Sequence, residues 1–164
     1  VNLLRQGGAA VLAQSKYLRP HALNIGVNLI GPDDMRTILH APICADCVEL
    51  DIGVNELGDG GIDALVSSPQ LQHLATLRIP SNLITADGIA ALVAWPGFQR
   101  LVQLDIGDNQ IDPATEAMLR SAWGSRPATM LRTDETPEQS QEEEFNFHQM
   151  IAQIMAENQG GHQE

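Results

Sequence analysis

The sequence contains few aromatic residues, few cysteines and no cluster of basic residues. Aromatics make up 4% of the 164 residues, so a core built from this chain must be mainly aliphatic. The two cysteines, Cys44 and Cys47, are too few to suggest the disulfide framework of a small secreted domain, so a cytoplasmic setting is expected. The lack of a basic cluster argues against a nucleic-acid surface and against an anionic membrane surface. No apolar run reaches the length of a membrane span.

The acidic charge is concentrated at the C-terminal end. The net charge is −12, yet residues 1–132 hold 13 acidic and 9 basic residues, whereas residues 133–164 hold 8 acidic and no basic ones. This change of composition predicts a boundary near residue 134. A globular part, residues 1–133, is therefore expected to precede an acidic tail, residues 134–164.

A six-residue pattern, Leu-x-Ile-x-x-Asn, occurs four times in the globular part. Successive copies are 27 residues apart, without insertion or deletion. The copies begin at Leu23, Leu50, Leu77 and Leu104, and they end at Asn28, Asn55, Asn82 and Asn109. A fixed period of this length is typical of repeat proteins, in which each unit buries its apolar face against its neighbours.

The residue pattern within each 27-residue unit predicts a strand, a turn, a helix and a segment that returns to the next strand. In the second unit, Leu50 and Ile52 point to the same side of a strand, because strand side chains alternate. Ile62 and Leu65 follow at the spacing of one helix face, and Pro69 ends the helix. The strands of successive units are therefore expected to run parallel and to stack side by side, with the helices covering one face.

The stretch from Gly58 to Leu74 is similar to the leucine-rich repeats of the ribonuclease-inhibitor-like class, in a form common in large bacterial proteins. The resemblance covers about residues 3–132 and implies an α/β solenoid with parallel strands on its concave face and helices on its convex face. The units are then a half repeat, residues 1–20, four repeats, residues 21–47, 48–74, 75–101 and 102–128, and a closing strand, residues 129–133. Such scaffolds serve many functions, so the resemblance specifies a fold rather than an activity.

Both ends of the repeat array depart from the pattern. Near the start, Val11 aligns with Leu65 and Tyr17 with Leu71, but the strand that should precede them is missing. Either the chain is a fragment of a longer protein, or the array starts with an irregular helical cap. At the other end, Thr133 stands where a fifth copy of the pattern would have isoleucine. The closing strand is therefore expected to be degenerate.

The acidic tail contains one predicted amphipathic helix, at about residues 137–158. Phe147, Ile151 and Ile154 share one face of this helix, and Gly160 lies just beyond its end. The helix is expected to cap the open end of the solenoid. Two alternatives stay open at this point, docking into a partner's groove and tail-mediated self-association.

The asparagine column and the cysteine pair have structural interpretations. Four asparagines in register are expected to satisfy backbone groups at tight turns rather than to bind a ligand. A Cys-x-x-Cys pattern can hold zinc or act in redox chemistry. Cys44 and Cys47, however, occupy the positions that Leu71 and Leu74 occupy in the next unit, which predicts that both are core residues. No metal-ligand set, cofactor motif or nucleophile–base spacing is visible in the sequence.

The residues beside the inward-pointing leucines and isoleucines form the candidate binding surface, because they point to the concave side of the predicted sheet. Since adjacent strands lie about 4.8 Å apart, Arg78 is expected to reach both Asp51 and Asp105. A column of small residues that begins at Gly26 would let a partner approach the backbone. The candidate partner-binding residues are Asn24, Glu49, Asp51, Thr76, Arg78, Gln103, Asp105 and Arg132. The alternative is a row of exposed ion pairs that neutralise one another and bind nothing.

These observations favour a non-enzymatic protein-interaction module that binds a protein partner through the concave face. Two other functions stay open. The first is a GTPase-activating protein, because some proteins of this repeat class that carry acidic tails stimulate a small GTPase. The second is a structural spacer within a larger protein. No nucleic acid, membrane, metal ion or cofactor is expected to bind.

Overall fold

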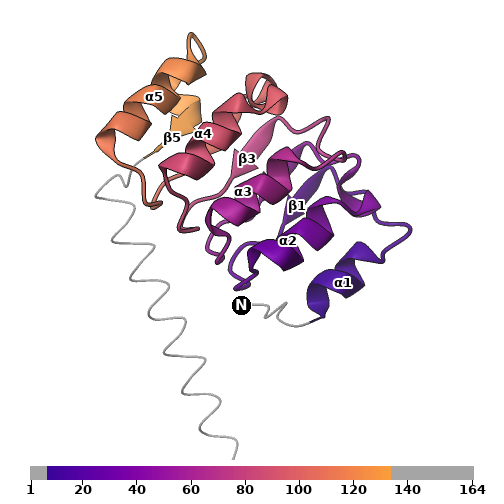
Figure 1. Cartoon of the computed structure of the whole chain (residues 1–164). Coiled ribbons are helices and arrows are strands. Elements are labelled where there is room, and N and C mark those ends of the chain that lie inside the picture. Colours follow the sequence, from indigo (N-terminus) through magenta and orange to yellow (C-terminus); the bar gives the residue numbers. More distant parts are fainter. Residues whose placement is uncertain (1–6, 134–164) are drawn as a thin grey trace, which may run out of the picture. The chain divides into compact units, whose positions relative to one another are not determined.

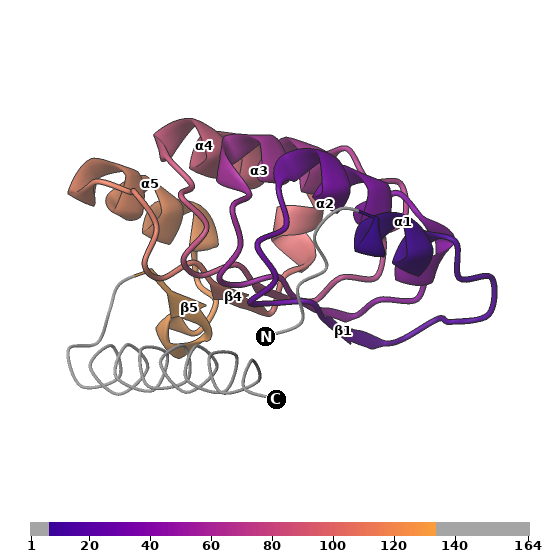
Figure 2. The ribbon, with the colours of Figure 1, turned by 90° about the horizontal axis from the view of Figure 1, so that it is seen from below.

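Five short parallel strands lie side by side in chain order in the computed structural model, which describes residues 7–133 (Figure 1). The strands are β1 (Ala22–Asn24), β2 (Glu49–Asp51), β3 (Thr76–Arg78), β4 (Gln103–Asp105) and β5 (Leu131–Arg132). The α-helices are α1 (Gly8–Ala13), α2 (Pro32–Leu39), α3 (Gly58–Val66), α4 (Ala86–Ala94) and α5 (Pro113–Trp123). Three short 3-10 helices are η1 (Pro42–Cys44), η2 (Pro96–Arg100) and η3 (Ala128–Met130). Figure 2 shows the helices in one layer and the strands in another, so the described part is an α/β structure.

Each strand pairs with the next in the register of the 27-residue repeat. Leu23 lies beside Leu50, Leu50 beside Leu77, Leu77 beside Leu104, and Leu104 beside Leu131. The predicted pairing is therefore confirmed, and it is compatible with a solenoid. The predicted tail helix, residues 137–158, lies outside the described residues. Within residues 7–133, no helix is long and apolar enough to cross a membrane.

The core lies between the two layers and is mainly aliphatic, as the composition predicts, with Trp95, Phe98 and Trp123 as its aromatic members. Leu50 and Ile52 are both fully buried, which shows that alternate strand side chains point toward the helices. The helical stripe of α2 is buried as well, at Met35, Ile38 and Leu39. Each such side chain stabilises the fold by about 1.5–3 kcal/mol through the removal of its apolar surface from water.

The repeated asparagines link neighbouring units through their side-chain amides. The Nδ2 of Asn55 donates to the backbone oxygens of Ile52, at 3.0 Å, and of Ile25 in the preceding unit, at 3.2 Å. Its Oδ1 accepts the N–H of Ile30, at 2.9 Å. Asn109 makes the equivalent bonds one pair of units later. The prediction that these asparagines satisfy turn backbone is therefore confirmed.

The turns that follow the strands alternate between two forms. In the first and third units, Leu29 and Leu83 have positive φ angles of 53° and 61°, in the left-handed region. The residues at the same place in the second and fourth units are Glu56 and Gln110, which do not have positive φ angles. Their N–H groups instead donate to the carbonyl of the preceding turn, at 3.1 and 2.8 Å. At this position the backbone therefore alternates from one unit to the next, although the second and fourth turns still differ at Gly58, which has a φ of 53°, and Asp112, which has a φ of −86°.

The first unit does not follow the predicted alignment. The prediction that Val11 and Tyr17 occupy core positions is wrong, because they are 73% and 93% exposed. Helix α1 instead buries Ala9 and packs Leu12 and Ala13 against the core. This stripe is shifted by one residue, which rotates the buried face by about 100°. Among the described residues, the elements with which α1 has its main contacts are α2 and η1, so the loop that carries Tyr17 lacks the second neighbour that covers the return segments of inner units.

The closing strand is shorter than predicted, and a polar cluster holds it in place. β5 has two residues, and Met130 belongs to the preceding 3-10 helix rather than to the strand. The Thr133 hydroxyl donates to Glu116 Oε1, at 2.7 Å, and accepts from Arg120 Nη2, at 2.6 Å. The hydrogen bond from Thr133, and then that from Arg120, lower the pKa of Glu116 below its usual value. Polar bonds at this end thus add to the apolar stripe of α5, in which Leu119 and Trp123 are buried.

One arginine closes the C-terminal end of the core. The guanidinium of Arg126 lies over the rings of Trp123 and Phe98, with its Cζ 3.9 and 4.9 Å from their centroids. It also donates to four backbone oxygens, those of Phe98, Leu101, Ala122 and Trp123, at 2.8–3.2 Å. Burial lowers the pKa of Arg126, but a guanidinium starts so high that it remains protonated. The side chain therefore supplies donors to carbonyls at the ends of η2 and α5, among which the Phe98 carbonyl also accepts the Leu101 N–H, at 3.2 Å.

Candidate interaction surface on the strand layer

All eight predicted site residues lie on the five strands, in two rows that cross the sheet. One row pairs Glu49 with Thr76 and Thr76 with Gln103. The other row runs through Asn24, Asp51, Arg78, Asp105 and Arg132. The intervening leucines are buried toward the helices, so both rows occupy the opposite face of the sheet.

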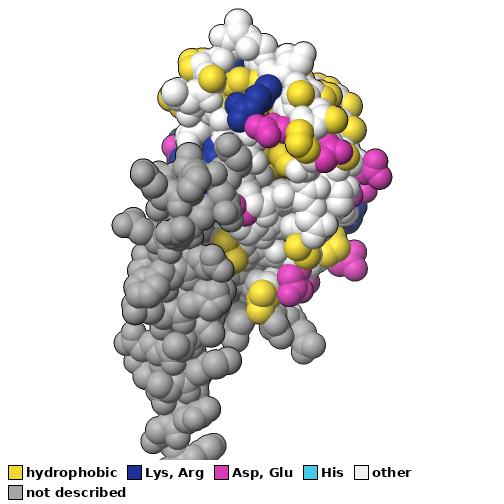
Figure 3. Space-filling model, turned by 90° about the vertical axis from the view of Figure 1, so that its left-hand side faces the viewer, with side chains coloured by type: hydrophobic (Ala, Val, Ile, Leu, Met, Phe, Trp, Pro, Cys, Tyr) yellow, Lys and Arg dark blue, Asp and Glu magenta, His cyan; other side chains and the backbone are white. Residues whose placement is uncertain are grey.

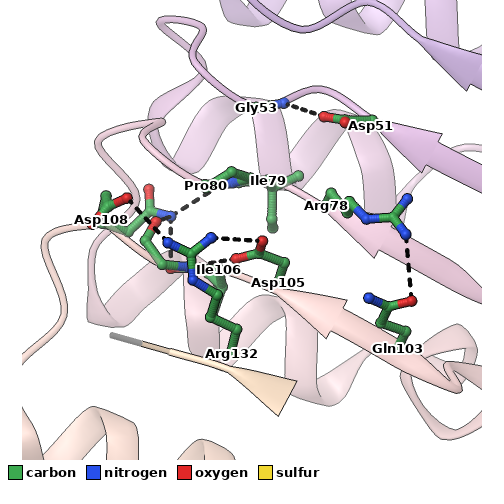
Figure 4. Close-up of polar contacts among 12 residues, drawn as sticks. Asp51, Gly53, Arg78, Ile79, Pro80, Gln103, Asp105, Ile106, Asp108 and Arg132 are labelled. Atoms are coloured by element: carbon green, nitrogen blue, oxygen red, sulfur yellow. Dashed lines mark hydrogen bonds and ion pairs between the residues drawn. The ribbon is translucent and has the colours of Figure 1, made fainter. Parts of the chain in front are cut away.

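The C-terminal end of the second row is tightly ion-paired (Figure 4). Arg132 Nη1 lies 3.1 Å from Asp105 Oδ2, and Arg132 Nη2 lies 3.8 Å from Asp108 Oδ2. The side chains are 26%, 16% and 21% exposed, so solvent screens these contacts only in part. The guanidinium also covers Gly107, where an added Cβ would meet its Cζ and Nε at 3.4 Å. This cluster is a packed part of the fold rather than a free surface.

Arg78 does not make the ion pairs that its register predicts. Among the described residues, its polar contacts are Glu49, at 3.9 Å, and Gln103, at 3.4 Å, and both lie toward the start of the strands. The predicted pairs with Asp51 and Asp105 are absent because both carboxylates turn the other way, toward the ends of their strands. Each accepts the N–H of the glycine two residues on, at 3.1 Å (Figure 4).

The exposed face of strands β1–β3 therefore carries charged side chains that contribute little to the stability of the fold. Asp51 accepts from Gly53 and from the Asn24 amide, at 3.2 Å, but it has no cation among the described residues. Glu49 and Arg78 have side chains that are 54% and 36% exposed and meet only at the limit of an ion pair. A pair of this kind contributes about 0–1 kcal/mol to stability.

The glycine column does not open the backbone to a partner, in contrast to the prediction. A Cβ on Gly53 would lie 2.9 Å from two ring carbons of Pro80. A Cβ on Gly26 would lie 3.0 Å from the carbonyl oxygen of Gly53. The small residues are needed because the neighbouring unit already fills the space above them, so they serve packing between units.

The fold also brings together a serine and a histidine that the sequence analysis did not pair. His40 Nε2 lies 3.3 Å from Ser67 Oγ and 3.1 Å from the Ala64 carbonyl oxygen. A carbonyl only accepts, so Nε2 carries the proton in this contact and cannot act as a base toward the serine. The Ser67 hydroxyl itself donates to the Asp63 carbonyl at 2.5 Å. The group therefore caps the end of α3. Its signal in the sequence is the 27-residue spacing of His40 and Ser67.

The cysteine pair is buried in the core, as predicted. Cys44 and Cys47 are both 0% exposed and free. Burial, and then the proximity of Cys47, raise the pKa of the Cys44 thiol to about 12, and burial also raises the pKa of Cys47. Neither sulfur is therefore a thiolate near neutral pH, the form that binds metals and reacts. Within residues 7–133, no group of three or more His, Cys, Asp or Glu side chains is placed to hold a metal ion.

No protein-family model matches this chain, and no curated protein is significantly similar to it.

Proposed function

We propose that the chain is a leucine-rich-repeat solenoid of the ribonuclease-inhibitor-like class. The 27-residue strand register, the helices on one face of the sheet and the asparagine bonds between units support this assignment. The test is to duplicate residues 48–101, which adds two units and preserves the alternation of turns. A longer array should stay folded and should unfold with a larger denaturant m-value, because more surface becomes exposed. A duplicated chain that aggregates or that keeps the original m-value contradicts the proposal.

The solenoid acts as a non-enzymatic interaction module that binds a protein partner through the strand face. The observation that carries this proposal is the contrast between charges on that face. Arg132 and Asp105 are packed together, whereas Glu49, Asp51 and Arg78 are exposed or lack a close counter-ion among the described residues. Charges that the fold does not use are available to a partner, and repeat arrays commonly bind on this face.

Affinity capture with the whole chain tests the strand face. The bait variants are Asp51→Arg and Arg78→Glu, and the matched control is Asp63→Arg on the exposed side of α3. Arg78→Glu and Asp63→Arg should melt within about 2–3 °C of the wild type, because neither loses a buried contact. Asp51→Arg also loses the acceptor of the Gly53 N–H, so it should melt lower while it stays folded at the temperature of the capture. A specific partner should be captured by the wild-type chain and by Asp63→Arg, and lost with both strand-face variants. If no captured protein follows that pattern, the strand face is not the binding site and the spacer function is favoured.

A cytoplasmic location is part of the same proposal. Two free thiols that stay reduced and buried suit a reducing compartment. Fractionation of cells that express the chain from its natural gene checks the location, and recovery of the chain outside the cytoplasm contradicts it.

A further inference from the structure

Two exposed leucines stand in equivalent places in the first and third units. Leu29 is 37% exposed and Leu83 is 54% exposed, and they are 54 residues apart in the sequence. Each follows a buried asparagine and has a positive φ angle. That backbone conformation favours glycine or asparagine over leucine, because the Cβ of a leucine crowds the backbone there. Each leucine thus adopts a strained backbone conformation while a large part of its apolar side chain stays in contact with water.

The distance between the two leucines follows from the hydrogen bonds between turns. The ladder continues beyond the strands. The Glu56 N–H donates to the Ile30 carbonyl, which joins the first and second turns. The Gly58 N–H donates to the Asn82 carbonyl, at 2.8 Å, which joins the second and third turns. Neighbouring turns therefore keep the separation of hydrogen-bonded strands, about 4.8 Å. Leu29 and Leu83 are two turns apart, which places their backbones about 10 Å apart. The side chain between them belongs to Glu56, which is exposed.

The turn segments that carry the two leucines and their neighbours are acidic, and the nearest basic side chain among the contacts of these segments is that of Arg132, which pairs with Asp108 in the fourth turn. The four turn segments, residues 27–34, 54–60, 81–87 and 108–113, contain seven acidic residues and no lysine or arginine. Several of the acids lie in first turns of helices, where they stabilise the positive helix end. Glu56 lies outside any helix, so this cause does not apply to it. Figure 3 faces the side on which α5 begins and shows acidic side chains next to hydrophobic ones, with arginine or lysine side chains beside the acidic ones in its upper part.

We infer that this turn edge, defined by Leu29, Glu56 and Leu83, binds a basic amphipathic helix of a partner protein. A helix rises about 1.5 Å per residue, so positions i and i+7 are about 10.5 Å apart, which matches the two leucines. Apolar side chains at i and i+7 of the partner contact Leu29 and Leu83. A lysine or arginine at i+3 or i+4 lies on the same helix face and meets Glu56. The chain's own residues 134–164 do not have this chemistry, because they contain no lysine or arginine.

The turn edge is separate from the strand face. Its three side chains follow the strands in the chain, whereas the strand-face residues lie on the strands themselves. A partner could therefore occupy one surface without the other, and the two surfaces are tested with different variants.

Binding of a designed peptide to the whole chain tests the inference. The probe is a fluorescein-labelled, alanine-based helical peptide of fifteen residues, with leucines at its fourth and eleventh positions and lysines at its seventh and eighth. The control peptide exchanges the second leucine with the alanine two positions further on, which turns that side chain by about 200°. Fluorescence anisotropy should show saturable binding of the first peptide and at least about tenfold weaker binding of the second, a difference of about 1.4 kcal/mol.

The matched protein variant is the double substitution Leu29→Asn with Leu83→Asn. Asparagine tolerates positive φ, so the melting temperature should stay the same or rise while peptide affinity falls at least about tenfold. The control is Val102→Asn, which removes an exposed apolar side chain, 60% exposed, elsewhere on the surface and should leave the affinity unchanged. Glu56→Gln should weaken binding and reduce its dependence on salt. No binding of the first peptide, equal binding of the two peptides, or full affinity in the double variant overturns the inference.

Discussion

The two ends of the strand face carry the same motif but use its charge differently. Asp51 and Asp105 each accept the N–H of the glycine two residues on, at the same distance of 3.1 Å. Asp105 also pairs with Arg132 at 3.1 Å, whereas the further partner of Asp51 within residues 7–133 is the neutral amide of Asn24. One unit further on from Asp51 stands Arg78, in the same register position that Arg132 has relative to Asp105. An arginine at the same register position therefore forms an ion pair with Asp105 but not with Asp51.

This difference shows which charges belong to the fold. The space over Gly107 is filled by the guanidinium of Arg132, but the space over Gly53 is filled by the ring of Pro80. Because Pro80 occupies the place that a guanidinium takes in the other half, Arg78 lies toward the strand start, beside Glu49. The β4–β5 end is thus a closed polar cluster, and the β1–β3 end keeps exposed charges. Predictions about stability should separate the ends in the same way.

Removal of Arg126 is expected to have the largest effect, because it opens the closed end. Arg126→Ala removes two ring contacts and the donors to four carbonyls, and it leaves those carbonyls partly buried. The expected loss is about 3 kcal/mol of unfolding free energy, measured by urea denaturation. The control is Arg100→Ala, since Arg100 lies 5.8 Å from the Trp95 ring and is exposed. That change should cost about 0.5 kcal/mol. Equal losses from the two variants would contradict the closing role.

Replacement of the strand-end glycines by alanine should cost more stability at the β1–β3 end than at the β4–β5 end, the opposite of the order expected for the charged residues. Gly53→Ala places a Cβ 2.9 Å from the rigid ring of Pro80, and the expected cost is about 2 kcal/mol. Gly107→Ala places it 3.4 Å from the flexible Arg132 side chain, and the expected cost is below about 1 kcal/mol. Gly31→Ala is the control, because an added Cβ there meets nothing within 4 Å. If Gly107→Ala is the more costly change, the packing role assigned to Pro80 is wrong.

The features that the sequence predicts are those that depend on the repeat period. A spacing of 27 residues places Leu50 beside Leu77 whatever their side chains do, because the backbone ladder sets the register. Core positions follow from the same argument, so even Cys44 could be assigned to the core from its alignment with Leu71. The polar bonds of Asn55 follow as well, since a buried amide must satisfy nearby backbone groups.

The 27-residue period does not predict the direction of exposed side chains or the packing of the first and last units of the repeat array. Arg78 has several rotamers that reach different neighbours, and strand register alone does not choose between them. Val11 lies in a helix whose buried face is shifted by one residue, because among residues 7–133 this helix packs mainly against α2 and η1, whereas an inner helix packs between two others. Arg126 has no counterpart in the other units. Its role depends on Trp123 and Phe98, which come together only in the folded end.

Replacement of the two strand-face arginines, Arg78 and Arg132, by alanine should give a smaller difference in stability between the two ends. Arg132→Ala leaves Asp105 and Asp108 close together without this cation and uncovers Gly107, and the expected cost is about 1–2 kcal/mol. The cost stays modest because Arg132 Nε is buried without a hydrogen-bond partner, which offsets part of the gain. Arg78→Ala should cost less than about 0.5 kcal/mol, because its pair is long and exposed. Equal costs, measured by thermal unfolding at two salt concentrations, would show that the two ends do not differ as proposed.

The smallest expected effect is a pH dependence that belongs to the closed end alone. The pKa of Glu116 lies below its ordinary value of 4.5 in the folded state, because Thr133 and Arg120 donate to its carboxylate. As the pH falls, the unfolded state therefore takes up the proton first. The stability from Glu116 is full above pH 4.5 and is lost as the pH falls through the lower, folded pKa. Glu116→Gln should thus destabilise the chain by less than about 1 kcal/mol at neutral pH, and it should flatten the fall in stability below pH 4.5.

Thr133→Val keeps the carboxylate of Glu116 but removes its first hydrogen-bond donor, so it should flatten the fall in stability over the same pH range to a smaller degree. Urea midpoints between pH 3 and pH 7 check both changes. An unchanged acid limb in Glu116→Gln would mean that the Thr133 hydroxyl holds β5 without help from the carboxylate charge.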